Sequence, residues 1–457
     1  MTRQSTTQGG SQPEGPAGGR VTAARRAAAG WLRTPAPTTP PFGDAAAGDA
    51  PADGPSGAAR LRDRVRGCLL AGAVGDALGA GIEFDSLSRI RAQHGPAGVT
   101  GYVPAYRRLG AVTDDTQMTL FTVEGLLLAT RHDGEPSRPA PPSGAVGARS
   151  SAGHLGAAGV IAAEPADAAD LAARMLAGTS RPRDVIEVHR AYLRWRSTQV
   201  DVSVPPAHPA PEDGWLIGEQ WLHDLRAPGT ACVSGLSNDR PGTLAEPKNP
   251  GSKGCGTVMR AAPFGLLPDL TAEQAFRLAV ECSVLTHGHP TGYLSAGALA
   301  AVVHALVHGA PPVNAVRSAA ALAATWPEHH ETTGALSAAL AAAIRDTTEG
   351  GGPSVEALCA LGQGWTAEEA LAMAVYCLLA EPDPAAALLL AVNHGGDSDS
   401  TGSVTGNLLG ALHGGDALAR ALPGEWLERL EGRPTIERLA DEFAAALADR
   451  LPPAGTA

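Results

Sequence analysis

Residues 391–402 read Ala-Val-Asn-His-Gly-Gly-Asp-Ser-Asp-Ser-Thr-Gly, which places two carboxylates and three hydroxyls in five consecutive positions. The stretch follows an apolar run, so we expect the polar cluster where a buried helix ends. The glycine pair 395–396 lets the backbone turn sharply, and the oxygen atoms can then converge on one point. Oxygen ligands of this kind suit Mg²⁺, Mn²⁺ or Ca²⁺ far better than Zn²⁺. The stretch therefore predicts a cation site at a helix boundary.

Two simpler explanations of this cluster are a helix cap and an EF-hand. Asp, Ser and Thr are preferred N-cap residues, so 397–401 could cap a helix over 402–413. A cap needs only one such side chain, however, and five consecutive polar positions exceed that need. An EF-hand loop begins in the same way, but Leu408 occupies the position of its bidentate glutamate. The sequence thus favours a cation site of another type.

A second oxygen-rich cluster, Thr113-Asp114-Asp115, lies nearly 300 residues earlier and also borders an apolar helix. Considered alone, it is explained equally well as an ordinary helix cap. Two adjacent carboxylates exceed the need of one cap, and the two clusters together supply four. Buried carboxylates are costly unless a cation neutralises them. The pair of clusters predicts a site for one or two divalent cations that the fold assembles.

Glu83 is an acidic residue between Ile82 and Phe84, after a glycine-rich stretch. An apolar setting raises the pKa of a carboxyl group and suits it to general acid or base chemistry. The spacing alone fits a solvated loop residue better, so a catalytic role is one of two hypotheses for Glu83.

Residues 249–260 form a glycine-rich loop that enters an apolar segment. The backbone N–H groups of such a loop can cradle a phosphate or pyrophosphate. The loop matches neither common nucleotide fingerprint, because Met259 stands where a GxGxxG motif needs glycine and no Gly-Lys-Ser/Thr ends it. A plain surface loop explains the pattern equally well.

His287 and His289 form a His-x-His pair that could bind zinc, as in the zinc amidohydrolases. In those enzymes the pair follows the first strand of a barrel, but here it lies in mid-chain between helical patterns. The sequence therefore favours one histidine lining a pocket over two zinc ligands.

The 457-residue composition favours one large domain. Residues 1–57 contain few large apolar side chains and are rich in Gly, Pro and Ala, so we expect them to be disordered. A low-complexity insertion at about 131–180 begins in a similar way. The predicted domain spans 58–450, followed by a short tail at 451–457.

The net charge of −12, without any stripe dense in Lys or Arg, indicates no nucleic-acid surface. The six cysteines form no CxxC pair, which is typical of a reducing compartment with thiols as small core residues. Neither a signal pattern nor an uninterrupted apolar run of membrane-spanning length is present. We expect a soluble, cytoplasmic monomer without membrane contact.

Apolar residues recur at helical spacing, and alternating strand patterns are scarce, so the predicted fold class is all-α. Thr271 with Gln274 and Thr366 with Glu369 match the capping-box pattern of a helix start. The first predicted helix begins near residue 59. The other main predicted helices cover 116–130, 181–199, 271–285, 291–308, 366–378, 383–392 and 436–447.

Five motifs, in this order and spacing, resemble those of the ADP-ribosylglycohydrolase family, which includes the dinitrogenase-reductase-activating glycohydrolases. The motifs extend over residues 60–415, nearly the whole of the predicted domain. They are Gly67-Cys-Leu-Leu-Ala-Gly-Ala-Val-Gly-Asp-Ala-Leu-Gly79, Val112-Thr-Asp-Asp-Thr-Gln117, Gly254-Cys-Gly-Thr-Val-Met-Arg-Ala-Ala-Pro263, Thr286-His287 and Gly395-Gly-Asp-Ser-Asp-Ser-Thr-Gly402.

The resemblance implies an all-helical, largely single-domain fold around a binuclear Mg²⁺ or Mn²⁺ centre. Family members commonly have threonine where Ser400 stands, and the serine retains the hydroxyl ligand. The positions that match the metal ligands of the family are Thr113, Asp114, Asp115, Asp397, Asp399 and Ser400.

The resemblance also implies substrate contacts. His287 matches a substrate-contacting histidine, and Glu83 matches a catalytic acid of some members. Cys255 replaces a frequent asparagine in the loop that holds the diphosphate of ADP-ribose, which leaves the backbone contacts of that loop possible. The loop positions implied to bind substrate are Gly251, Ser252, Lys253, Gly254, Cys255 and Gly256.

The implied activity is metal-dependent hydrolysis of the N- or O-glycosidic bond at C1″ of ADP-ribose. This reaction removes ADP-ribose from a modified protein or small molecule. Positive charge develops at C1″ as in glycoside hydrolysis, and the metals orient the distal ribose. The alternative is a non-catalytic ADP-ribose-binding or crystallin-like relative.

Overall fold

The computed structural model describes residues 56–131, 179–199, 211, 213–348 and 351–451. Every regular element within these ranges is a helix, apart from two isolated β-bridges. The all-α prediction is confirmed.

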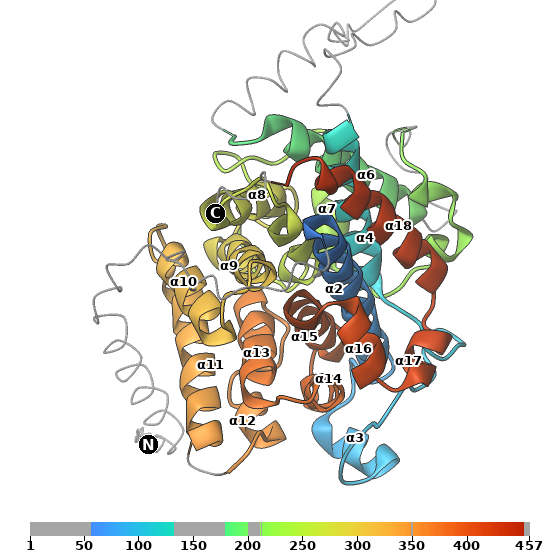
Figure 1. Cartoon of the computed structure of the whole chain (residues 1–457), viewed down its shortest axis with the longest axis vertical. Helices are drawn as coiled ribbons and strands as arrows, with labels where there is room; N and C mark the ends of the chain where they lie inside the picture. The colour runs from blue at the N-terminus through green and yellow to red at the C-terminus, as the bar shows by residue number, and fades with distance from the viewer. Residues whose placement is uncertain (1–55, 132–178, 200–210, 212, 349–350, 452–457) are drawn as a thin grey trace, which may run out of the picture.

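The helices form a bundle in which α2 and α15 lie side by side near the centre (Figure 1). The α-helices are α2 (Gly57–Gly79), α3 (Leu87–His94), α4 (Asp114–Arg131), α6 (Pro182–Thr198), α7 (Thr230–Gly235), α8 (Ala272–Ser283), α9 (Pro290–Val307), α10 (Pro312–Ala323), α11 (His330–Thr348), α12 (Val355–Cys359), α13 (Ala367–Ala380), α14 (Pro384–Val392), α15 (Ser398–His413), α16 (Gly415–Ala421), α17 (Gly424–Arg429) and α18 (Arg433–Ala448). Short 3₁₀ helices are η2 (Leu216–Gly218), η3 (Gln220–His223), η4 (Val258–Arg260) and η5 (Ala262–Leu266).

Glycines bring α2 and α15 into backbone contact. A Cβ atom on Gly406 would overlap the carbonyl oxygen of Ala71, and one on Gly75 would overlap the carbonyl oxygen of Gly402. Because residues four apart lie on one face of a helix, glycines 402, 406 and 410 present a single smooth strip to α2. The two helices therefore approach more closely than ordinary side chains would permit.

This antiparallel packing places the end of α2 beside the start of α15. Gly79, the last residue of α2, meets the backbone of Ser398 and Asp399. The polar cluster at the start of α15 therefore lies next to Asp76 and to the loop that leaves α2.

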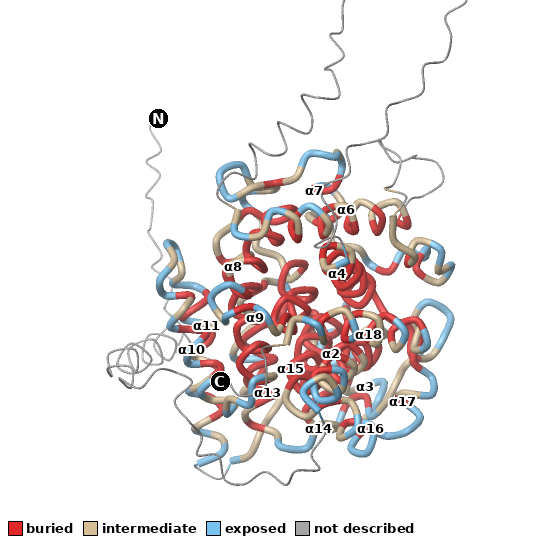
Figure 2. The backbone as a smooth tube through the Cα atoms, turned by 45° about the horizontal axis from the view of Figure 1, so that its top comes forward, coloured by how far each residue is buried: buried red, intermediate tan, exposed pale blue. Residues whose placement is uncertain are grey.

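The other helices surround this pair. α4 packs against α6 and α18, α9 against α8 and α10, and α11 against α13. Buried residues concentrate in α2, α4, α9, α13 and α15 (Figure 2). α9 is long and apolar enough to cross a membrane, but 83% of its 18 residues are buried inside the fold. The apolar surface of α9 is therefore buried in the core of the fold.

The two predicted capping boxes have different outcomes. Thr271 and Gln274 form the complete box at the start of α8. α13 begins after Thr366, as predicted, but the Thr366 hydroxyl is buried and has no partner among the described residues. Glu369 instead accepts a hydrogen bond from the Gln363 N–H at 3.2 Å, so this predicted box is wrong.

The predicted disordered segment 1–57 and the insertion at 131–180 lie almost wholly outside the described residues, as does the tail 451–457. The described chain enters α2 at Gly57, where the Ser56 hydroxyl accepts a hydrogen bond from the Ala59 N–H at 3.2 Å. This start lies close to the position predicted from the apolar pattern.

Gly406→Ala should lower the free energy of unfolding by about 1–3 kcal/mol or more, because its methyl group would overlap the Ala71 carbonyl. Chemical denaturation followed by circular dichroism measures this loss. Gly334→Ala is the matched control, since Gly334 lies on the exposed side of α11 with open space around it. That variant should be stabilised by up to about 1 kcal/mol. Equal effects of the two substitutions would contradict the close approach of α2 and α15.

Candidate active site

Three carboxylates meet where α2 ends and α15 begins. One oxygen from each of Glu83, Asp397 and Asp399 lies within 4.8 Å of the other two, and all three side chains are buried. Like charges this close do not all ionise without compensation. The C-terminal cluster that the sequence predicted is therefore assembled, and Glu83 belongs to it.

Asp397 both caps α15 and faces the cluster. Its Oδ1 accepts a hydrogen bond from the Ser400 N–H at 3.4 Å, as an N-cap does, and its Oδ2 accepts one from the Cys255 thiol at 2.8 Å. Oδ1 of Asp399 also accepts from the Ser400 N–H, at 3.0 Å. The helix-cap explanation is thus correct for one oxygen of Asp397, but it does not account for Asp399.

Asp76 joins the Thr113 segment to this end of α2. Its fully buried carboxylate accepts hydrogen bonds from the backbone N–H groups of Thr113, at 3.0 Å, and Thr116, at 3.1 Å. The Thr116 hydroxyl donates to the same carboxylate, and the Thr113 side chain contacts Asp399. Two segments nearly 300 residues apart therefore meet, as the sequence predicted.

Burial raises the pKa of each carboxyl group in the cluster. The charge of Asp399 adds to burial at Asp76, whose pKa rises to about 7, and at Glu83, whose pKa rises to about 10. The pKa lies well above its usual range at Asp114, Asp115 and Asp397 for the same reasons. Without a cation, the cluster therefore retains protons at neutral pH.

The donor atoms fit divalent cations of the hard class. Oε2 of Glu83 and Oδ1 of Asp115 are buried without a hydrogen-bond partner among the described residues. Such orphaned oxygens are costly, and Mg²⁺ and Mn²⁺ prefer carboxylate and hydroxyl oxygens of this kind. The Thr113 side chain contacts Asp399, and the Ser400 side chain contacts Asp397. A cation here would satisfy atoms that the protein leaves unpaired.

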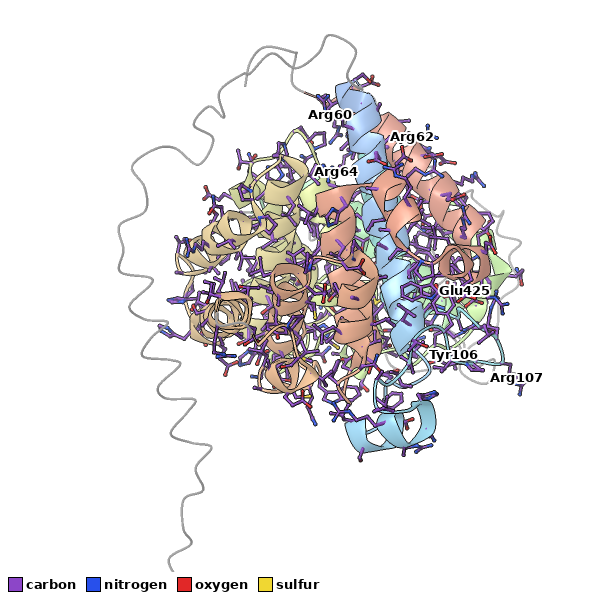
Figure 3. The ribbon with its side chains drawn as sticks, turned by 60° about the horizontal axis from the view of Figure 1, so that its bottom comes forward. Arg60, Arg62, Arg64, Tyr106, Arg107 and Glu425 are labelled. Carbon is purple, nitrogen blue, oxygen red and sulfur yellow. The ribbon has the colours of Figure 1, made fainter. Side chains whose placement is uncertain are left out.

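Glu83 is buried, so the interpretation as a solvated loop residue is wrong. Its exposed neighbour Phe84 stacks on Trp365, with ring centres 5.8 Å apart. The Trp365 carbonyl in turn accepts a hydrogen bond from the Cys255 N–H at 3.2 Å. Tyr106, which lies near the C-terminal end of α2 (Figure 3), has a pKa raised by burial and by the charge of Glu83. Exposed aromatic side chains thus border the buried acids.

Lys253 in the glycine-rich loop is held by acidic residues outside the cluster. Its ammonium group lies 2.8 Å from Glu331 of α11 and 2.7 Å from Glu368 of α13. These two ion pairs fasten the loop to both helices, and a substrate contact by the Lys253 side chain stays a prediction.

The backbone of the same loop keeps free donors. The N–H groups of Ser252 and Cys255 donate to the carbonyls of Asn249 and Trp365. Those of Gly254 and Gly256 have no backbone partner among the described residues. The N–H groups of Gly251 and Lys253 also have no backbone partner among the described residues, so four N–H groups of the loop are candidate donors to an anion.

His287 is buried against this loop. Its Nδ1 lies 2.8 Å from the Thr286 hydroxyl, whereas a Cβ atom on Gly256 or Gly254 would lie 3.2 or 3.5 Å from its Nε2. Burial, assisted by the charge of Arg260, lowers the pKa of His287 to about 3. The ring is therefore neutral and presents Nε2 to the loop.

His289 does not join His287 at a metal site. Its Nδ1 accepts a hydrogen bond from the Thr291 N–H at 3.2 Å and caps α9. Within the described ranges, the acidic cluster is the one group of three or more potential ligands drawn from His, Cys, Asp and Glu. The zinc amidohydrolase alternative thus lacks its histidine pair and its barrel in this part of the chain.

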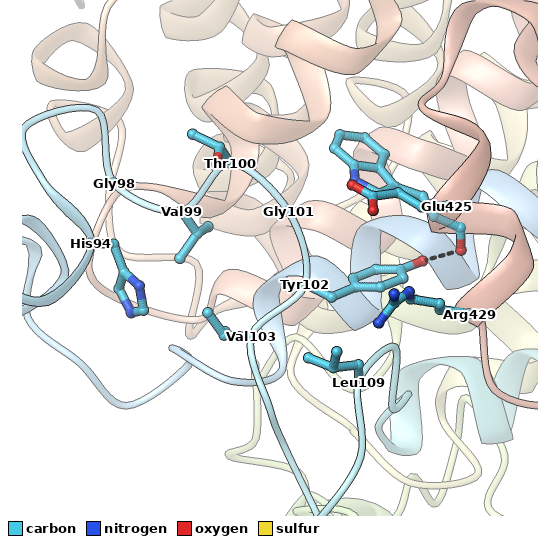
Figure 4. A pocket seen from close by; sticks show the side chains of 11 residues that line it. His94, Gly98, Val99, Thr100, Gly101, Tyr102, Val103, Leu109, Glu425 and Arg429 are labelled. Carbon is cyan, nitrogen blue, oxygen red and sulfur yellow. Dashed lines mark hydrogen bonds between the residues drawn. The ribbon is translucent and has the colours of Figure 1, made fainter.

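A separate pocket of about 390 Å³ lies between the loop after α3 and the short helix α17 (Figure 4). Tyr102 crosses it, and its hydroxyl donates to the Trp426 carbonyl at 2.8 Å. The predicted site residues do not line this pocket.

The sequence model of the ADP-ribosylglycohydrolase family matches residues 57–453. The chain belongs to the ADP-ribosylglycohydrolase family. The resemblance predicted from the motifs is confirmed, and membership supports glycosyl hydrolase activity on substrates related to ADP-ribose.

The chain is also similar to two individual proteins. An uncharacterized protein of Archaeoglobus fulgidus is 25% identical over 387 residues, which cover 84% of this chain and 96% of that protein. A solved structure of an ADP-ribosylglycohydrolase-related protein complex has 23% identity and a TM-score of 0.47, and the match covers 85% of this chain and 99% of the other.

No function is predicted from the sequence for two buried residues of the site, Asp76 and Arg260. Asp76 orients the Thr113 segment, and Arg260 lies behind His287. The signal for Asp76 is a carboxylate in the second half of α2, where the other residues of 67–79 are small or apolar and a charge is costly without partners. Arg260 closes the glycine-rich motif, but its contacts depend on residues from three other segments.

Mg²⁺ or Mn²⁺ should raise the melting temperature more at about pH 8 than at about pH 5. Carboxyl groups whose pKa is raised in the fold stabilise the metal-free protein at low pH, and this stabilisation is lost as pH rises through about 7 for Asp76 and about 10 for Glu83. At low pH a cation must also displace the protons. Differential scanning fluorimetry with added metal or EDTA measures the shift. The same shift at both pH values would argue against binding at this cluster.

Proposed function

We propose that this protein is a divalent-metal-dependent hydrolase that cleaves the glycosidic bond at C1″ of an ADP-ribose conjugate and releases ADP-ribose. The observation that carries the proposal is the buried cluster of Glu83, Asp397 and Asp399, with the Thr113 segment packed against it. Its neighbours are a loop with free N–H donors and a neutral histidine. Such an arrangement suits a substrate that combines ribose hydroxyls with a diphosphate.

The cation would be held by the two clusters. Mg²⁺ or Mn²⁺ bound there supplies a Lewis acid that orients and polarises the hydroxyls of the distal ribose. The residues proposed to hold one or two such ions are Thr113, Asp114, Asp115, Asp397, Asp399 and Ser400.

Glu83 is the candidate proton carrier. A buried carboxyl group with a raised pKa holds a proton at neutral pH and can deliver it to the leaving atom at C1″. Positive charge develops on the ribose as that bond breaks, and the surrounding carboxylates stabilise it. A water molecule then bonds to C1″ and returns a proton to the Glu83 carboxylate, which completes the hydrolysis. The free N–H groups of Gly254 and Gly256 would meanwhile hold the diphosphate. These contacts involve only the ADP-ribose part of the substrate, and the group attached at C1″ is the variable in the test below.

The test is a turnover panel. The full chain is incubated with ADP-ribosyl-arginine peptide, ADP-ribosyl-serine peptide and O-acetyl-ADP-ribose, each with Mg²⁺, Mn²⁺ or EDTA, and released ADP-ribose is measured. We expect release from at least one conjugate and its loss in EDTA. Binding of ADP-ribose without release from any conjugate would favour the non-catalytic alternative.

Asp399→Asn and Asp114→Asn should each lower turnover by at least about 100-fold, because each removes a charge that the cation needs while the amide keeps a similar shape. Asp416→Asn, on the exposed surface of α16, is the matched control and should keep full turnover. Circular dichroism confirms that the helices persist. Full activity of Asp399→Asn with metal bound would refute the ligand assignment.

A further inference from the structure

Arg260 is a fully buried cation that has no carboxylate partner among the described residues. Its guanidinium group lies 2.6 Å from the Thr286 hydroxyl, 3.3 Å from the Cys232 sulfur and 4.4 Å from the centre of the Tyr192 ring. Burying a charge without an opposite charge is costly. The contacts of Arg260 include the Thr286 hydroxyl next to His287 and the Cys232 thiol, together with Met118 of α4 and Tyr192 of α6.

The direction of the hydrogen bond between Arg260 and Thr286 is fixed by chemistry. A guanidinium group donates only, so the Thr286 hydroxyl oxygen accepts from Arg260. The hydroxyl hydrogen then has two possible acceptors: the Ser283 carbonyl at 3.4 Å and His287 Nδ1 at 2.8 Å. Only the shorter distance falls in the usual range for a hydroxyl donor. This geometry favours donation from Thr286 to Nδ1, which places the ring proton of His287 on Nε2.

The protonated nitrogen is the one that borders the loop. Gly256 and Gly254 lie beside Nε2, and a side chain on Gly256 would collide with the ring. Arg260 also supports this loop by a second route, because the Cys232 thiol that it contacts donates to the Gly256 carbonyl at 3.8 Å. One buried cation thus holds both the histidine ring and the loop that faces it.

We propose that Arg260, acting through Thr286, is a positioning residue that fixes His287 as the Nε2–H tautomer, so that the ring donates a hydrogen bond to a diphosphate oxygen of the substrate. The identity of that oxygen rests on the proposed function, whereas the tautomer does not. In this arrangement His287 binds and orients the substrate, and proton transfer is left to Glu83.

Nitrogen NMR of the full chain labelled with ¹⁵N-histidine tests the tautomer without any substrate. The His287 signals are assigned by their loss in His287→Gln. We expect a neutral ring with a protonated Nε2 and an unprotonated, hydrogen-bonded Nδ1. A proton on Nδ1 would overturn the proposal.

Thr286→Val tests the route from Arg260. It should change the Nδ1 signal and reduce turnover about tenfold, the equivalent of one hydrogen bond, whereas Thr286→Ser should restore both. Thr405→Val is the matched control, since Thr405 is equally buried and donates to the Thr401 carbonyl instead. Wild-type Nδ1 shifts in Thr286→Val would refute the route. If the wild-type chain releases no ADP-ribose, the proposed function fails, and the NMR comparison still decides the positioning role.

Discussion

The close approach of α2 and α15 is the constraint on which the site depends. Glycines on both helices let the backbones touch, so that the end of one helix lies against the start of the other. Asp76 and Glu83 arrive from one side, and Asp397 and Asp399 from the other. Bulkier residues along this strip would separate the two sets of acids. The small residues of α2 are thus as much part of the site as its carboxylates.

This geometry concentrates negative charge in the interior, and the protein balances it locally in several ways. Backbone and hydroxyl donors saturate Asp76, and the Cys255 thiol donates to Asp397. Some oxygens are left over, which is the state a cation site needs before it binds its ion. On the far side of the loop, Arg260 is embedded among sulfur atoms and an aromatic ring, which keeps a positive charge close to the substrate loop without neutralising the acids.

The sequence was sufficient to predict the all-helical fold, the family and the meeting of the two polar clusters, because these depend on local periodicity and on motifs. The spacing around Glu83 favoured a solvated loop residue, because its burial depends on distant segments such as the start of α15, which no local pattern reports. The orientation of Lys253 toward Glu331 and Glu368 is hidden for the same reason. For Asp397, both interpretations from the sequence are correct, because one carboxylate oxygen caps α15 and the other belongs to the cluster.

The distance along the chain between the two clusters also bears on biosynthesis. Asp114 and Asp115 are synthesised nearly 300 residues before Asp399, so the nascent chain carries these acids without Asp399 while the intervening residues are added. Contacts of such long range form late and slow the folding of a domain. The acidic cluster therefore cannot form before α15 has been synthesised, and the early carboxylates wait for the residues that complete it.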